Sequence, residues 1–198
     1  MITVIIERLS LPENAAVYAV LETVILFLII LITGFLINLI NAVITDALAG
    51  IIGSVPAFIL RNYLTYPGTV HHELSHALLA FITGARIKKI VLLPKGAALG
   101  SVEIETRGNL FLRALQLSLS AIAPVILGAV SLFSMWSFIL PRTKEIWQYI
   151  LFWYVFVSIL FHMSLSGADY RSFFKGLLPT LILFFLIFLV LGSFGISF

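Results

Sequence analysis

The sequence predicts an α-helical polytopic membrane protein, with five to six transmembrane or re-entrant helices and a small β-hairpin at the membrane surface. Composition is the first observation behind this prediction: the 198 residues are 61% hydrophobic and 11% charged, with a mean hydropathy of +1.15. Soluble domains are roughly 45–50% apolar and about 25% charged. The second observation is that apolar residues gather in runs of about 20, the length that crosses a bilayer. We therefore expect one transmembrane domain over residues 1–198, with no appended soluble domain.

The first element is a short segment, residues 1–14, that mixes apolar and charged residues and ends with Pro12 and Asn14. We expect it to lie at the membrane interface. The spanning or re-entrant segments are then expected at about 16–45, 47–62, 67–84, 110–140, 146–165 and 177–197. The first of these runs is longer than the core of a signal peptide and lacks a basic leader, which predicts a retained helix. The second is short and broken by glycine and proline, so it fits a re-entrant segment as well as a crossing.

Between Arg86 and Arg107 the hydrophobic pattern changes from helical to alternating. The stretch IKKIVLLP is followed by KGAALG and then by SVEIETR, in which Val102 and Ile104 alternate with acidic residues. A period of two on both sides of a glycine-containing turn is typical of a β-hairpin. We expect residues 86–107 to form this hairpin outside the hydrocarbon.

Basic residues predict which way the chain faces. Six lysines and arginines lie around the hairpin and two more in the loop at 166–176, whereas the loop after Leu140 carries two. Positively charged loops stay in the cytoplasm, so we expect the hairpin, and the opening of any site beside it, to face the cytoplasm in the cell membrane. The net charge of +3 is no sign of nucleic-acid binding, because the basic residues cluster in loops as membrane topology demands. We expect the lipid bilayer, and no nucleic acid, as a partner.

The run at residues 67–84 contains the pattern H-E-x-x-H, formed by His72, Glu73 and His76. A spacing of four residues places both imidazoles on one helix face, about 6 Å apart along the axis, where they can bind one zinc ion. Glu73 projects about 100° from His72, so its carboxylate can reach a metal-bound water and act as general base. His71 is turned off the metal face by the same angle, and we expect it to be solvated or to support the ligands.

Ionisable groups inside an apolar span are unfavourable by roughly 2.5–3.5 kcal/mol each on insertion scales, and they usually mark function. A polar helix end that meets interfacial water is the alternative explanation, but packing alone does not account for three such groups in helical register. The chain has no cysteine, which excludes disulfides, thiol nucleophiles and zinc–thiolate sites. Any metal must therefore be held by histidine, aspartate or glutamate.

A catalytic zinc needs a third protein ligand and an open position for water. Asp169 follows the fifth apolar run on the membrane face that the motif helix reaches at its end, and it would meet His76 if the segment before it dips inward. His162 is the rival ligand, and Asp46 is a third candidate; the alternatives for them are a hydrogen-bonded core histidine and a polar helix end. Small residues would line a water path to this site or pack helices together: Gly68, Ser75, Ser118, Ser120, Ser164 and Ser166.

The stretch HELSHALLAFITGARIKKIVLLPKGAA, residues 72–98, resembles the signature segment of the site-2 protease family of intramembrane zinc metalloproteases. In that family the H-E-x-x-H helix is followed by a small-residue turn, a strand that ends in leucine-proline, and a turn that contains glycine. A second stretch, LSLSAIAPVILG at 117–128, is similar to the family's helix after the hairpin. The two stretches occur in the family's order.

The resemblance implies a single metalloprotease-like transmembrane domain with one Zn²⁺ held by His72 and His76, water activated by Glu73, and a third ligand from an aspartate on a later transmembrane helix. That aspartate falls on Asp169, although the stretch SLSGADYRS lacks the prolines that usually precede it in the family. The implied activity is that of a zinc metalloendopeptidase, which hydrolyses peptide bonds within or near transmembrane segments of membrane-protein substrates.

Two other functions are consistent with part of the sequence. A non-catalytic, protease-like membrane subunit would keep the zinc helix and bind partner transmembrane helices; the unusual residues around Asp169 favour it, and the intact H-E-x-x-H pattern argues against it. A metal-ion transporter would place ligands on several successive spans, whereas this chain has one cluster. Nothing in the sequence specifies an oligomeric state.

Overall fold

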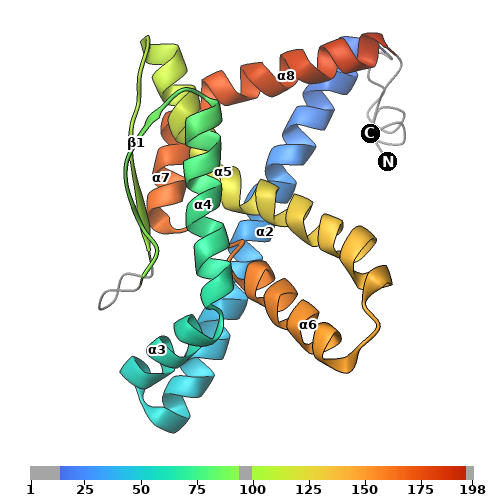
Figure 1. Ribbon diagram of the computed structural model, residues 1–198. Coiled ribbons are helices and arrows are strands. Elements are labelled where there is room, and N and C mark those ends of the chain that lie inside the picture. Colours follow the sequence, from blue (N-terminus) through green and yellow to red (C-terminus); the bar gives the residue numbers. More distant parts are fainter. Residues whose placement is uncertain (1–13, 94–99, 195–198) are drawn as a thin grey trace.

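The computed structural model describes residues 14–93 and 100–194, and these residues are mainly helical (Figure 1). The predicted helical architecture with one small sheet is confirmed. The predicted interfacial segment at 1–14, apart from Asn14, and most of the predicted hairpin turn lie outside the described residues.

The longest helix, α2 (Ala15–Ile52), begins after Asn14, whose side chain caps the first turn by accepting a backbone hydrogen bond at 3.0 Å. It continues past the predicted end near residue 45. Gly53, with a φ of 86°, then turns the chain back into α3 (Ser54–Leu64), because glycine adopts positive φ without steric strain. The predicted segment 47–62 is therefore the end of one helix followed by most of a short second one, rather than a separate crossing.

The helix α4 (Tyr66–Ile82) carries the H-E-x-x-H pattern. Pro67 lies in its first turn, where a missing N–H is harmless, and Gly84 with a φ of 87° redirects the chain after its end. The antiparallel strands β1 (Arg86–Val91) and β2 (Ser101–Glu105) follow, which confirms the predicted hairpin. The sheet lies alongside α4 rather than beyond its end (Figure 1).

Gln116 attaches both ends of this hairpin to the helical body. Its fully buried side chain accepts a hydrogen bond from the backbone N–H of Arg107 at 2.8 Å and donates one to the carbonyl of Thr83 at 3.0 Å. Thr83 precedes β1 and Arg107 follows β2, so one amide fixes the sheet where it leaves α4 and where it enters the next helix.

From Leu110 to Ser193 the chain is mainly helical. Asn109 caps α5 (Leu110–Ser134), which contains Pro124 and continues through a π-helical segment, η1 (Met135–Ile139), and a 3-10 turn, η2 (Leu140–Arg142). After α6 (Ile146–Phe161) come α7 (Gly167–Lys175) and α8 (Leu177–Ser193).

The buried core lies where α2, α5 and α7 meet. Phe27 of α2 stacks on Phe173 of α7 with ring centroids 5.6 Å apart, and Ile122 of α5 is fully buried in the same cluster. The connection between α6 and α7 adds Met163 and Leu165 to this core. The segment that leads into α7 is therefore packed inside the molecule rather than along its surface.

The structure shows fewer membrane spans than the five to six predicted. In the described part of the chain, α2 and the continuous helix Leu110–Arg142 are long and apolar enough to cross a membrane, and α7 with α8, bent by 70°, would make a third as a broken span or a re-entrant loop. The helices α4 and α6 have 17 and 16 residues. At helical rise these are about 26 and 24 Å long, short of a hydrocarbon core of about 30 Å.

Candidate metal centre

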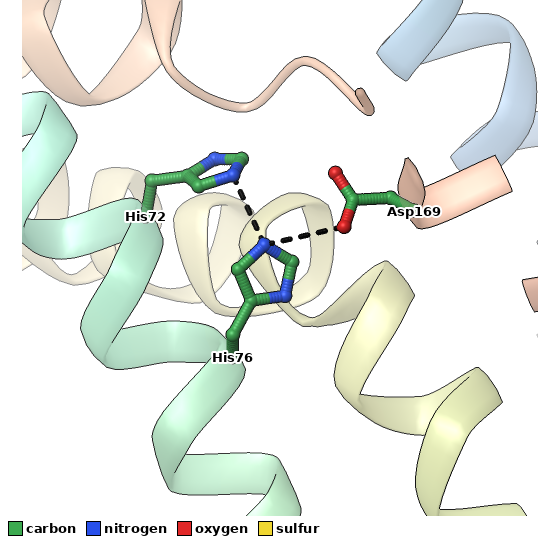
Figure 2. Close-up of side chains that lie close together, drawn as sticks. All are labelled: His72, His76 and Asp169. Carbon is green, nitrogen blue, oxygen red and sulfur yellow. Dashed lines mark hydrogen bonds and ion pairs between the residues drawn. The ribbon is translucent and has the colours of Figure 1, made fainter. Parts of the chain in front are cut away.

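Three side chains from α4 and α7 converge on one point (Figure 2). The Nε2 atoms of His72 and His76 are 3.0 Å apart, and Oδ1 of Asp169 is 3.5 Å from Nε2 of His76. Among the residues described, these three form a group that could hold a metal ion, with all ligand atoms within 4.8 Å of one another.

Backbone carbonyls orient both imidazoles. Nδ1 of His72 lies 2.6 Å from the carbonyl oxygen of His162, and Nδ1 of His76 lies 2.6 Å from that of Ser120. A carbonyl accepts hydrogen bonds only, so each Nδ1 carries the proton and each Nε2 is left with its lone pair, the form that binds metals. The hydroxyl of Ser120 also donates to the carbonyl of His76 at 3.0 Å, which fixes α5 against α4 at the level of the site.

Asp169 is held by its own helix. The Ser166 hydroxyl accepts a hydrogen bond from the Asp169 N–H at 3.2 Å, and Oδ2 of Asp169 accepts one from the Ser166 N–H at 2.7 Å. This reciprocal pair is a capping box, which satisfies two backbone donors at the start of a helix. Oδ2 is thus hydrogen-bonded at the start of α7, and Oδ1 is the oxygen that faces His76.

Glycines on three helices let the segment before α7 pass through the interior. A Cβ at Gly34 of α2 would lie 2.8 Å from Cγ of Leu165, and a Cβ at Gly128 of α5 would collide with Met163. A Cβ at Gly68 of α4 would overlap the Ser158 carbonyl near the end of α6. The inward dip that the sequence required for Asp169 is therefore present, and it depends on these close approaches.

Neither rival ligand belongs to the three-residue group. Nε2 of His162 is 3.0 Å from the Thr69 hydroxyl and its Nδ1 is 3.0 Å from the carbonyl of Ser158, so both ring nitrogens already have partners. His162 acts on the site through its backbone carbonyl instead. Asp46 is exposed on α2 and belongs neither to the three-residue group nor to the lining of the adjacent cavity. His71 points away from the group, toward Ser131 of α5, with Nε2 2.9 Å from that hydroxyl.

Glu73 lies beside the three-residue group and under the sheet. The residue is 8% exposed, and a Cβ at Gly100, just before β2, would lie 2.7 Å from its Cγ. Both Glu73 and Gly100 line the same cavity as His72, His76 and Asp169, with a volume of about 550 Å³. The carboxylate is therefore covered by the hairpin on one side and faces the cavity on the other.

The small residues predicted to line a water path divide into two sets. The cavity lining includes Ser120, Ser164 and Ser166. Outside that lining lie Gly68, Ser75 and Ser118. Of these, Ser75 donates to the carbonyl of His71 within α4, and Ser118 packs under Gly176.

Sequence reasoning missed the groups that aim the ligands. The carbonyls of His162 and Ser120 belong to the backbone, and no side-chain pattern signals which carbonyl will meet an imidazole. It also missed three further polar residues that line the cavity, Asn38, Asn41 and Arg61. A lone basic residue within an apolar run was the one available signal for Arg61.

The donor types fit zinc, and so do the two separations that involve Nε2 of His76, while the ligand atoms of His72 and Asp169 lie within 4.8 Å of each other. Zinc binds His nitrogens and carboxylate oxygens at about 2.0–2.2 Å in tetrahedral geometry, which separates neighbouring ligand atoms by roughly 3.3 Å. The observed separations of 3.0 and 3.5 Å lie on either side of that value. Three ligands also leave one tetrahedral position open toward the cavity, as in catalytic rather than structural zinc sites.

The fold and the site together define a helical membrane protein with a partly buried group of two histidines and one aspartate of metal-ligand type. Comparison of the chain with protein-family models, with curated proteins and with solved structures finds no match. The arrangement of His72, His76 and Asp169 is therefore the main indication of function.

Proposed function

We propose that this protein is an intramembrane zinc metalloprotease that hydrolyses peptide bonds within or near transmembrane segments of other membrane proteins. His72, His76 and Asp169 would hold one Zn²⁺ per chain, and Glu73 would be the general base. The observation that carries the proposal is the convergence of an aspartate from α7 on two imidazoles of α4 whose free nitrogens are aimed by backbone carbonyls.

The metal ligands, Glu73 and the hairpin would each have a role in this reaction. A zinc ion, when bound, supplies Lewis acidity and brings the pKa of water at the site toward about 7. Glu73 accepts a proton from the water that attacks the scissile carbonyl, and it returns that proton to the amine that leaves. The hairpin over Glu73 limits access of bulk water to its carboxylate.

A substrate helix must unwind locally before its carbonyl can be attacked, because helical carbonyls are engaged in hydrogen bonds. The strand β2 lines the cavity through Ser101, Val102 and Ile104. An unwound substrate segment can pair with such a strand by β-strand addition. A purely structural role for the sheet, as a cover over α4, is the alternative.

The proposal also includes a location. It places the shorter helices α4 and α6 inside the bilayer together with the candidate spans α2, Leu110–Arg142 and α7 with α8. The cluster of basic residues around the hairpin supports an opening toward the cytoplasm and residence in the cell membrane.

A non-catalytic membrane subunit that binds partner transmembrane helices is the second candidate. The residues around Asp169 favour it, because SLSGADYRS departs from the pattern of the protease family that the chain resembles. Such a protein would retain its partner binding after Asp169→Ala, whereas a protease would lose its metal.

The test combines metal content with cleavage. Wild type, His72→Ala, Glu73→Gln and Asp169→Ala would be purified in detergent, together with Asp46→Ala as a matched control on the exposed face of α2. We expect about one zinc per chain in wild type, Glu73→Gln and Asp46→Ala, and cleavage of single-span substrates by wild type and Asp46→Ala alone. A wild type without zinc, or a Glu73→Gln variant that cleaves as fast as wild type, would contradict the proposal.

A further inference from the structure

One of the residues that line the cavity carries a positive charge and donates hydrogen bonds only to neutral groups of the described chain. Arg61, in the last turn of α3, lines the same cavity as the three-residue metal group. The residue is partly buried, and burial of a charge is unfavourable unless that charge is paired.

The hydrogen bonds of Arg61 go only to neutral acceptors. Nη1 donates to the Thr45 hydroxyl at 3.1 Å and to the carbonyl of Asn41 at 3.4 Å. Nε and Nη2 donate to Oδ1 of Asn62 at 3.3 and 3.1 Å. A guanidinium has five N–H donors, so at least one is not used in these contacts.

The network around Arg61 also has more donors than acceptors. Nδ2 of Asn62 is buried and has no hydrogen-bond partner among the residues that the structure describes. Nδ2 of Asn41 donates a hydrogen bond to the carbonyl oxygen of Phe161 at 2.6 Å. Within the described part of the chain, no carboxylate is in ion-pair contact with Arg61.

The cavity's own carboxylates do not supply the missing negative charge. Only Glu73 and Asp169 line it among the described residues, and both lie at the metal group. A divalent cation held there would be balanced by these two carboxylates. The charge of Arg61 would then remain as a net positive charge in the cavity.

We infer that Arg61 binds a carboxylate of the substrate and thereby selects which peptide segment enters the cavity. The guanidinium fork is the side chain best suited to carboxylates. Two sources present this chemistry: an aspartate or glutamate side chain near the scissile bond, or a free C-terminal carboxylate. The inference rests on the proposed function for the identity of the ligand as a peptide, and it makes Arg61 a specificity-determining residue.

The test measures binding separately from turnover. Three fluorescent single-span peptides that share one sequence apart from a single variable position would be compared in detergent. The neutral peptide has glutamine at that position and an amidated C-terminus. The second peptide has glutamate at that position and an amidated C-terminus, and the third has glutamine and a free C-terminal carboxylate. The glutamate would be placed at several positions in turn. Dissociation constants would be measured by anisotropy on zinc-loaded Glu73→Gln protein, alone and combined with Arg61→Gln, Arg61→Lys or Arg113→Gln, the last being an exposed arginine of α5.

We expect one of the two carboxylate peptides to bind about tenfold more tightly than the neutral peptide, and the tighter of the two identifies the source. Arg61→Gln should reduce the preference to less than about twofold, Arg61→Lys should retain part of it, and Arg113→Gln should leave it unchanged. Equal binding of all three peptides to Glu73→Gln protein with Arg61 intact would overturn the inference, and this comparison needs no change at Arg61. A preference that disappears when zinc is removed, yet survives Arg61→Gln, would also overturn it.

The inference and the proposed function fail in different ways. Cleavage of the neutral peptide by wild type without any preference for carboxylates would leave the protease proposal standing and remove the role of Arg61. An Arg61-dependent preference without cleavage of any peptide would support the role of Arg61 in binding carboxylates and contradict the protease proposal.

Discussion

Two cavities of similar volume have opposite chemistry. The first, of about 550 Å³, contains the metal group and is lined by residues from α2 through α7. The second, of about 490 Å³, lies between α6 and the segment η1–η2, and apolar side chains such as Phe138, Leu151 and Phe152 make up most of its lining. The second cavity holds no histidine or carboxylate among its lining residues.

The difference shows that the candidate site is distinguished by side chains that converge from distant parts of the sequence, and not by the volume of its cavity. Elements that are consecutive in the chain build the second cavity, so the packing of one helical hairpin explains it. The first brings Asp169 to His76 across 93 positions of sequence, and it does so through glycine contacts on three helices. A cavity formed only by chance would not be expected to have both imidazoles oriented by carbonyls.

The largest expected effect is at Glu73. Replacement by glutamine keeps the shape but removes the base, so we expect cleavage to fall by about 10²–10⁴-fold with zinc content unchanged. Gln148→Glu, which adds a carboxylate to the second cavity, should restore nothing in that background. Loss of zinc in Glu73→Gln would show that Glu73 holds the metal, which would contradict its role as base.

Asp169→Asn should weaken zinc binding by at least about 100-fold, because an amide oxygen is a poorer ligand than a carboxylate and the effect should exceed that of losing a hydrogen-bond partner of a ligand. Competition with a chelator of known affinity measures this. Asp46→Asn, at an exposed position of α2, is the matched control. Equal affinities in the two variants would exclude Asp169 as a ligand.

Gly128→Ala tests whether the path of the segment before α7 depends on close packing. The added methyl would collide with Met163, and overpacking of this kind reduces stability by about 1–3 kcal/mol. We expect a lower thermal midpoint in detergent and weaker zinc binding. Gly50→Ala is the control, because a Cβ there would have nothing within 4 Å; if both variants behave alike, the contact has no such role.

Ser166→Ala removes one half of the capping box that holds Asp169. Loss of an N-cap costs about 1 kcal/mol, so we expect zinc affinity to fall about fivefold while Ser166→Thr remains near wild type. Titration of zinc into the metal-free variants provides the measurement. An affinity that Ser166→Ala leaves intact would mean that Asp169 is positioned without its cap.

The smallest effect is expected from filling the second cavity. Val155→Phe adds volume to its lining without touching the metal group, and we expect cleavage and zinc content within about twofold of wild type. A large loss of cleavage would show that the two cavities are coupled and do not act independently.

Much of this arrangement follows from local patterns in the sequence. The four-residue spacing of His72 and His76 places them on one face, and the alternation of Val102 and Ile104 produces the strand that lines the cavity. Helix lengths were less predictable: α2 runs on to Gly53 because nothing earlier in its sequence stops it, so hydropathy alone gave too many spans. Arg61 and the carbonyl of His162 join the site only through tertiary packing.

Because one carboxylate of Asp169 serves both α7 and the imidazoles, metal occupancy would be linked to the folding of α7 and α8. One of its oxygens holds the start of α7, and the other faces the imidazoles. Ion binding at the second oxygen would favour the conformation in which the first is engaged, and fraying of α7 would withdraw the ligand. By this reciprocity, a cell's supply of zinc would set how much of the protein has its C-terminal helices in place, and scarcity of the ion would expose that part of the chain to quality control.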